Sequence, residues 1–485
     1  MSARSQIVEL RDPTVALLLA IVTALSRIPF ATQRLWEWDS VLYARALEQG
    51  FHVDDVLSGS RPHPPGYIFY VAAAGLARLL GLDSDRALVA VSVLASGAAA
   101  AVCYLLCRRF VGRPLSCALV IAFASAPLVW VHGEVAMPYI LLAPLSAALA
   151  LAFRDARGAG ARRTVLVSFA FGALGGFRQD VLLFLFPLWL WMLWPAAGGA
   201  RLRAAFAFLA GCLAWLVPSA LLSDGLVAYA SRSVRQLIGV SSVSANTERS
   251  IALNAVLIGD SLFWGGLLLL AALLVLGLSR ALASIRGQRS PDDGEAGFFA
   301  LWLVPALLFY LFVHIGEWGY VLSLVPGMYV LLAWLLARAA ANARFVVVAV
   351  LANAALAAVL FVAGDDPVFS RASLLAHDRS TDAKTSWIRE QAPPGSIVLA
   401  AAEILVASYY LPDRAVRYSN AAAGATYGLT IGGPTTLIIY EPAARPANLR
   451  VSQTVELAGD GSLDLATVSS GTLELHGTDI GDTRR

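Results

Sequence analysis

Residues 87–106 read ALVAVSVLASGAAAAVCYLL, a run of twenty residues without a charged side chain. A helix of about 20 residues rises about 30 Å, which matches the thickness of the hydrocarbon core of a bilayer. Arg86 precedes the run and Arg108 follows it closely, so charged side chains bound the apolar stretch at both ends. We therefore predict that residues 87–106 cross a membrane as a helix.

The composition of the whole chain supports the same prediction. Of the 485 residues, 58% are hydrophobic and only 14% are charged, whereas soluble domains contain roughly 25% charged residues. The net charge is +3, and no basic tract is interleaved with aromatic residues, which argues against a nucleic-acid partner. The cysteines lie in or beside apolar runs and are interpreted as small packing residues. They are Cys103, Cys107, Cys117 and Cys212.

Apolar runs of this kind recur along the first three quarters of the chain. About eleven of them are bounded by charged or turn-forming residues, and each is interpreted as one transmembrane helix. The predicted spans cover residues 13–30, 87–106, 115–131, 135–153, 164–177, 181–194, 204–222, 262–278, 298–313, 320–336 and 345–363. The first is taken as an uncleaved helix, because no small-residue cleavage pattern is clear and many spans follow. The predicted fold class is therefore a polytopic α-helical membrane protein.

Arginine-rich turns indicate the side on which each loop lies, because short basic loops stay in the cytoplasm. The apolar run at 67–80 is interpreted as an interfacial helix, since a crossing there would place the arginine turn at 108–113 outside. Every short arginine-rich loop then lies inside. These loops carry Arg108, Arg109, Arg113, Arg154, Arg157, Arg162, Arg163, Arg201, Arg203, Arg280, Arg286, Arg289, Arg338 and Arg344. The N-terminus is then cytoplasmic, as in a multi-pass protein of a bacterial inner or plasma membrane.

The last quarter of the chain differs in character from the rest. Residues 364–485 gain charges, prolines and glycines, and we predict a small extracytoplasmic α/β domain there, after a transmembrane domain at 1–363. The stretches SIVLAA (396–401) and TTLIIYEP (435–442) follow Pro-Pro-Gly and Gly-Gly-Pro and are typical of strands. No internal repeat at a fixed period is visible, which weakens an inverted-repeat transporter interpretation.

The long first outer loop, residues 31–86, carries an acidic pair. Glu37 and Asp39 alternate with Trp36 and Trp38 just beyond the first span, so the carboxylates are expected at headgroup depth among aromatic anchors. If the protein transfers a sugar from a lipid phosphate, one carboxylate is suited to remove the proton of the attacking hydroxyl or amine. Alternatively, Asp39 caps a helix that begins at Ser40. Glu37 and Asp39 are also oxygen ligands for a divalent ion, although two carboxylates make an incomplete shell.

A proline-rich turn in the same loop carries two potential cations. Arg61 and His63 lie in RPHPPGY, where the chain returns to the membrane interface. Arginine binds a phosphate with two hydrogen bonds, so this turn suits the phosphate of a lipid. The alternative is that both side chains extend toward lipid headgroups without a specific ligand.

Three tight outer turns contain further polar residues. Charges at membrane depth are costly and are therefore candidates for a functional site. The turns contribute His132 and Glu134, then Arg178, Gln179 and Asp180, and finally His314, Glu317 and Tyr320. Arg178 and Asp180 have a simpler explanation as well, because they are spaced to pair with each other.

The order of these motifs resembles the GT-C superfamily of glycosyltransferases. The similarity is greatest to the branch of protein O-mannosyltransferases and the lipid A aminoarabinose transferase. The matching elements are Glu37-Trp38-Asp39 with Tyr43 after it, His63-Pro64-Pro65-Gly66-Tyr67, CRRFVGRP (107–114), GGFRQDVLLFLFP (175–187) and GYVLSLVPGMY (319–329). The sequence departs from many relatives at Ser40, where they have an acidic residue, and at Gly319, where they have arginine.

The resemblance implies an inverting transfer from a polyprenyl-phosphate sugar to an acceptor on the outer face. It implies that Asp39 is the base and that Glu134 lines the catalytic site. It also implies that the donor phosphate meets a set of residues comprising Arg61, His63, Tyr67 and Arg178. The sugar, the acceptor (protein, lipid or glycan) and any metal requirement stay open. The competing interpretations are a transporter or lipid flippase, and a scaffold that binds a partner through its C-terminal region.

Overall fold

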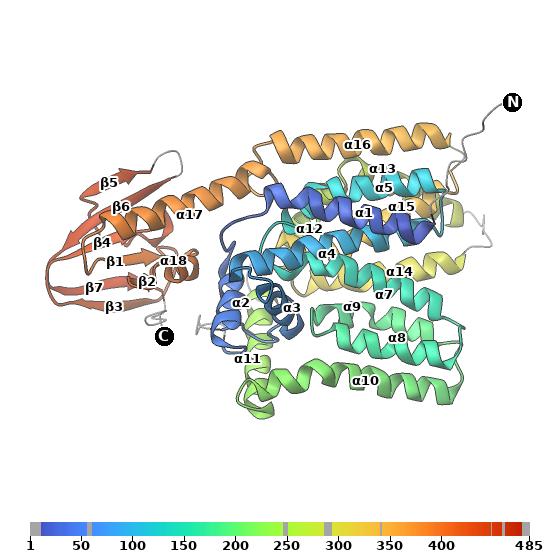
Figure 1. Cartoon of the computed structure of the whole chain (residues 1–485), viewed down its shortest axis with the longest axis horizontal. Helices are drawn as coiled ribbons and strands as arrows, with labels where there is room; N and C mark the ends of the chain where they lie inside the picture. The colour runs from blue at the N-terminus through green and yellow to red at the C-terminus, as the bar shows by residue number, and fades with distance from the viewer. Residues whose placement is uncertain are drawn as a thin grey trace.

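The computed structural model describes residues 11–55, 61–245, 251–285, 293–339, 342–447, 449–457 and 461–477. Long helices run side by side along one axis, and a β-sheet region lies beyond one end of this bundle (Figure 1). The helices of the bundle are α1 (Asp12–Arg27), α4 (Ser84–Cys107), α5 (Arg113–Ser125), α7 (Leu142–Ala156), α8 (Ala161–Leu174), α9 (Asp180–Leu193), α10 (Gly198–Leu221), α14 (Asp293–Phe312), α15 (Val325–Leu336) and α16 (Ala343–Ala363).

Six helical segments in the described part of the chain are long and apolar enough to cross a bilayer. They are Asp12–Phe30, Ser84–Cys107, Pro138–Ala156, Gly198–Leu221, Gly294–Phe312 and Ala343–Ala363. The outer surfaces of these helices carry large apolar side chains, as Leu202, Phe206 and Leu209 on α10 show. An apolar exterior of this kind needs lipid around it. The protein is thus a multi-pass helical membrane protein, and the total of about eleven spans remains a prediction.

The predicted span over residues 262–278 is not one straight helix. Two helices, α12 (Ile251–Gly266) and α13 (Leu268–Ile285), meet there at an angle of 107°. Leu267 between them has a left-handed backbone with φ 49°. The side chain of Asn353 on α16 accepts from the Leu268 amide at 3.0 Å, so it satisfies a donor that the break leaves without a helical partner. This partner lies far along the chain, and the local apolar pattern does not reveal it.

Ion pairs join the predicted cytoplasmic turns at one end of the bundle. Arg108 and Arg113 pair with Asp12 at the start of α1. Arg109 and Arg163, from two different turns, share Asp155. The arginine turns after α4 and α7 therefore lie together near the start of α1, as the topology requires. The predicted inside residues Arg286 and Arg289 lie outside the described part of the chain.

Three helices cross the opposite end of the bundle. They are α2 (Trp38–Gln49), α3 (Ile68–Arg78) and α11 (Leu226–Ala245) (Figure 1). The run at 67–80 forms α3, whose 11 residues are too few to span a bilayer by themselves. The helix α11 falls within residues 223–261, for which the sequence predicted only a loop.

The C-terminal region begins with α17 (Arg371–Gln391) and continues into a five-stranded sheet in the order β2-β1-β4-β6-β5. Its strands are β1 (Ile397–Ala400), β2 (Ala415–Tyr418), β4 (Thr435–Ile439), β5 (Gln453–Glu456) and β6 (Ser462–Val468). The strands β3 (Thr426–Ile431) and β7 (Gly471–His476) form a separate antiparallel pair. The two predicted strands are confirmed as β1 and β4, which pair in parallel with Ile397 opposite Leu437. The short helix α18 (Ile404–Tyr410) follows β1.

Candidate active site

The first turn of α2 presents the predicted acidic pair. The helix begins at Trp38, and Glu37 is its N-cap residue, whose amide donates to the Ser40 hydroxyl at 3.0 Å. Asp39 therefore lies inside the first helical turn and does not cap the helix, so the capping explanation for Asp39 is wrong. Its carboxylate is directed to a partner outside the helix.

That partner is His63. The Nε2 atom of His63 lies 3.2 Å from Oδ1 of Asp39, and its Nδ1 lies 2.8 Å from the Pro64 carbonyl oxygen. Burial alone raises the pKa of Asp39, but His63 and the charge of Arg178 outweigh it and hold that pKa below its ordinary value. Burial lowers the pKa of His63, and the Asp39 carboxylate and the Pro64 carbonyl raise it to a net value above the ordinary one. The arrangement is a carboxylate beside an imidazole, and each group favours the charged form of the other.

The turn that carries His63 is held in place by packing and by α11. Gly66 has φ 88°, and a Cβ there would lie 2.4 Å from Cγ2 of Val53. Only glycine fits a left-handed backbone that another side chain approaches so closely. The hydroxyl of Tyr229 on α11 donates to the Pro65 carbonyl at 3.0 Å. The Pro64–Pro65 peptide bond is cis. These contacts direct His63 toward the start of α2.

Arg178 lies under three tyrosines beside this pair. Its guanidinium carbon lies 4.9 Å, 5.1 Å and 5.5 Å from the ring centres of Tyr67, Tyr139 and Tyr320. Its Nη2 and Nε bond the two carboxylate oxygens of Asp180 at 2.6 Å and 3.3 Å. Only 2% of Arg178 is exposed. The predicted pairing of Arg178 with Asp180 is confirmed, and the guanidinium is covered in this structure.

Glu37 faces a separate cavity of about 220 Å³ between the outer turns. Its lining includes Trp36, His132, Tyr139, Glu317 and Trp318. Burial, together with the negative charges of Glu317 and Asp39, raises the pKa of Glu37 to about 8. The carboxyl group of Glu37 is therefore protonated at neutral pH, whereas that of Asp39 is ionised. Environment thus gives the two neighbouring acids opposite protonation states.

Glu134 is fully buried and its side chain faces Arg27 and Trp130. Within the described part of the chain, neither carboxylate oxygen of Glu134 has a hydrogen-bond partner, and the same holds for the Nε of Arg27. Burial raises the pKa of Glu134 well above its ordinary value, against the opposing charge of Arg27. Thr32 binds its backbone carbonyl through both an amide and a hydroxyl, at 2.9 Å and 3.0 Å. The structure thus places the Glu134 carboxyl against α1, while Asp39 faces His63.

Arg61 and His63 point toward opposite ends of α2. The Arg61 guanidinium bonds the side chain of Gln49 at the C-terminal end of the helix, whereas His63 binds Asp39 at the N-terminal end. Ten residues of helix, or about 15 Å, separate these two partners. The structure therefore brings His63, Tyr67 and Arg178 toward Asp39 and leaves Arg61 apart from them.

No group of three or more His, Cys, Asp or Glu side chains suited to a metal ion occurs within the described residues. Glu37 and Asp39 face different partners, namely Glu317 across the 220 Å³ cavity and His63. A divalent ion shared by Glu37 and Asp39 therefore has no third His, Cys, Asp or Glu ligand among the described residues.

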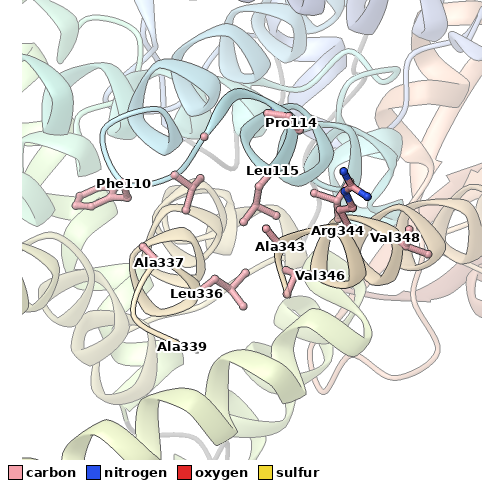
Figure 2. A pocket seen from close by; sticks show the side chains of 13 residues that line it. Phe110, Pro114, Leu115, Leu336, Ala337, Ala339, Ala343, Arg344, Val346 and Val348 are labelled. Atoms are coloured by element: carbon pink, nitrogen blue, oxygen red, sulfur yellow. The ribbon is translucent and has the colours of Figure 1, made fainter. Parts of the chain in front are cut away.

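Two larger cavities lie near the arginine turns. One, of about 670 Å³, lies between the start of α5, the end of α15 and the start of α16 (Figure 2). Its lining is apolar apart from Arg344. The other, of about 730 Å³, has Arg280 as the one charged residue among its described lining residues. The described lining residues of both cavities offer no carboxylate, imidazole or hydroxyl, whereas such groups gather at the other end of the bundle.

Sequence reasoning missed Tyr139 as part of the site. It lies between Arg178 and the 220 Å³ cavity, and its ring centre is 5.3 Å from that of Tyr320. The only available signal was an aromatic residue directly after Pro138 in a tight turn. Gly319 also gains a reason, because a Cβ there would lie 2.6 Å from Nε2 of His132. A side chain at this position would require His132 or Tyr139 to shift.

Neither a family model nor a curated protein matches the sequence. Among solved structures, the chain is similar to ArnT from Cupriavidus metallidurans bound to undecaprenyl phosphate, with a TM-score of 0.57 and 14% identity over 94% of this chain and 97% of that one. The apo state of ArnT gives a TM-score of 0.56 with the same identity and coverage.

The chain is also similar to the Archaeoglobus fulgidus oligosaccharyltransferase in complex with Zn and sulfate. Here the TM-score is 0.50 with 14% identity, over 84% of this chain and 62% of that one. At these identities the similarity shows a shared fold, so this protein has the fold of ArnT and of the oligosaccharyltransferase, in agreement with what the resemblance in the sequence implies.

Proposed function

We propose that this protein is a membrane glycosyltransferase that transfers a sugar from a polyprenyl-phosphate donor to an acceptor on the extracytoplasmic side. The observation that carries the proposal is the Asp39–His63 pair, with 3.2 Å between Oδ1 and Nε2, on a helix that crosses the end of the bundle. The shared fold supports the class of enzyme, and ArnT was solved with undecaprenyl phosphate bound.

Asp39 is proposed as the general base. The hydroxyl or amine of the acceptor donates its proton to the Asp39 carboxylate while its oxygen or nitrogen forms a bond to the anomeric carbon. The bond from that carbon to the phosphate oxygen breaks, and the polyprenyl phosphate leaves as a stable anion. Attack from the face opposite the phosphate inverts the anomeric configuration. A lowered pKa keeps the carboxylate of Asp39 ionised, which is the form that accepts a proton, although it also lowers the proton affinity of the group.

His63 and Tyr67 are proposed to contact the donor phosphate. The side chain of His63 is 17% exposed, and the Asp39 carboxylate raises its pKa and so favours its cationic form, which suits contact with an anion. Arg178 is covered and already paired with Asp180, so we propose that its charge acts on the site through space. Arg61 is proposed to meet lipid headgroups near the other end of α2. Glu134 is proposed to support the site from behind through Arg27.

Transfer from a radiolabelled polyprenyl-phosphate sugar tests this proposal. Asp39→Asn is expected to lower the rate by roughly 10²–10⁴-fold, the usual contribution of a general base. Asp413→Asn is the matched control, because Asp413 is an exposed aspartate of the C-terminal region. A rate for Asp39→Asn equal to that of the control would remove Asp39 from the role of base. No transfer by the wild-type protein with any polyprenyl-phosphate sugar would overturn the proposed function.

The proposed side is tested by labelling. A cysteine introduced as Asp413→Cys is expected to react with a membrane-impermeant maleimide in intact cells. The four native cysteines are buried or half-buried and serve as the background in the unmodified chain. Labelling that occurs only after lysis would place the C-terminal region inside the cell.

A further inference from the structure

Residues 33–36, here named the lead-in segment, connect the first span to Glu37 and Asp39. The segment belongs to no helix or strand, so its backbone groups need partners elsewhere. One carboxylate, that of Asp378 on α17, accepts from the amides of Gln33 and Arg34 at 2.8 Å and 3.1 Å. Two consecutive amides on one carboxylate make a charge-assisted pair of hydrogen bonds.

The next residue of the lead-in segment is bound in the same way. The Leu35 amide donates to the Tyr410 hydroxyl oxygen at 2.9 Å, and the Leu35 carbonyl lies 2.9 Å from Nε2 of His377. The Tyr410 hydroxyl in turn donates to Asp85 at the start of α4. Side chains of the C-terminal region therefore bind the backbone of residues 33–35, and Tyr410 connects it to the bundle as well.

Side chains of the lead-in segment add two more contacts to α17. The Arg34 guanidinium pairs with Asp382, and the Trp36 ring lies 4.6 Å from the ring of His377. Leu35 is fully buried between these contacts. Glu37 follows the segment directly, and Asp39 lies two positions later. A movement of the lead-in segment would therefore move Asp39 as well, because only two residues separate them.

The contacts continue along α2 itself. Arg45 donates to the Ser408 hydroxyl at 2.9 Å, and the Tyr409 hydroxyl donates to Glu48 at 2.5 Å. The helix that carries Asp39 thus rests on α18, while its N-terminal approach rests on α17. The contacts from α17 and those from α18 both belong to the C-terminal region, and both affect the position of the Asp39 carboxylate.

We propose that Asp378 and Tyr410 are positioning residues that hold the lead-in segment and thereby set the place of Asp39 in the reaction. This inference rests on the proposed function. Misplacing a reacting group by about 1 Å costs up to roughly 100-fold in rate. Neither residue touches Asp39 itself, so the effect is transmitted through the backbone of residues 33–36.

Hydrogen exchange and kinetics on the full-length protein in detergent test the proposal together. In Asp378→Ala, the amides of residues 33–35 are expected to exchange faster than in the wild type. The kcat for transfer is expected to fall roughly 10- to 100-fold, with the KM for the polyprenyl-phosphate sugar changed less than about threefold, because His63 and Tyr67 are untouched. Tyr410→Phe is expected to expose the Leu35 amide and to lower kcat in the same direction.

A graded series and a matched control separate positioning from general destabilisation. Asp378→Asn keeps one acceptor oxygen and is expected to give a kcat between those of Asp378→Ala and the wild type. Glu390→Ala, on an exposed position of α17, is expected to leave exchange and kcat unchanged. Unchanged exchange in Asp378→Ala, or a kcat within twofold of the wild type, would overturn the proposal. A wild-type protein without transferase activity would instead count against the proposed function, and exchange at residues 33–35 would still decide whether α17 holds the segment.

Discussion

Asp39 and His63 lie 24 positions apart in the sequence, and the structure brings them to 3.2 Å between Oδ1 and Nε2. The pair joins the start of α2 to a turn whose shape depends on Gly66 and on a contact from α11. It places a carboxylate and an imidazole side by side at one end of the helical bundle. Four predictions follow from this pair and its surroundings, each with its own measurement.

The first prediction concerns His63 and the alkaline side of the pH profile. The net pKa of His63 is raised above its ordinary 6.5 and that of Asp39 is lowered below 3.8. Both groups are therefore charged, and attract each other fully, at pH values between 3.8 and 6.5. The attraction is lost when the pH rises through the raised pKa of His63. It is also lost when the pH falls through the lowered pKa of Asp39. Wild-type kcat/KM is expected to fall on the alkaline side.

His63→Gln tests this assignment, since glutamine does not titrate. The variant is expected to lose the alkaline limb and to lower kcat/KM by at least about tenfold at neutral pH. His476→Gln, on β7, is the control and should keep the wild-type profile. An alkaline limb that persists in His63→Gln would belong to another group.

The second prediction concerns Glu37. Its folded pKa is about 8 against an ordinary 4.5, so the folded protein binds a proton that the unfolded chain releases in this range. The free energy of unfolding therefore falls as the pH rises from about 4.5 to about 8. Glu37→Gln cannot ionise, so its Tm relative to the wild type should increase steadily over this range. The control Glu390→Gln, on the surface of α17, should show no such trend in Tm. If Glu37→Gln shows no trend either, the carboxyl group of Glu37 has an ordinary pKa and the prediction is wrong.

The third prediction separates backbone strain from packing at two glycines. Gly50 and Gly66 have φ 92° and 88°, but only Gly66 has a neighbour where a Cβ would stand. Gly50→Ala is expected to cost about 1–2 kcal/mol of stability from its backbone conformation. Gly66→Ala is expected to cost a further 1–3 kcal/mol from the clash with Val53. Equal losses in denaturation experiments on the two variants would show that the turn shifts freely.

The fourth prediction concerns the covered pair of Arg178 and Asp180. Asp180→Ala leaves a buried cation without its partner and is expected to cost roughly 3–5 kcal/mol of stability. The double variant Arg178→Met, Asp180→Ala removes both charges and is expected to recover most of this loss. Asp55→Ala breaks an exposed pair with Arg235 and should cost under about 1 kcal/mol. Equal Tm losses in the single and double variants would argue against the pairing.

Local patterns in the sequence determined much of the architecture. An uncharged run such as residues 87–106 has one stable option in lipid, a helix that bonds its own backbone, and α4 forms over this stretch. The charge of the arginine turn at 108–113 predicts that the run at 67–80 does not cross, and the structure forms the short helix α3 there. The strands β1 and β4 follow from short β-branched runs between turn residues. Each of these signals lies within about twenty neighbouring residues.

Tertiary structure alone decided which groups meet. The chain bends at Leu267, where Asn353 binds the next amide, and the side chain of Glu134 faces Arg27. Tyrosine rings cover Arg178, and Asp378 binds the lead-in segment. Every one of these contacts joins residues that are distant in the sequence, and the free energy of a buried charge depends on the partner that folding places beside it. The sequence determined that acidic residues lie in this outer loop, whereas the folded environment determined that Asp39 is ionised and Glu37 is not.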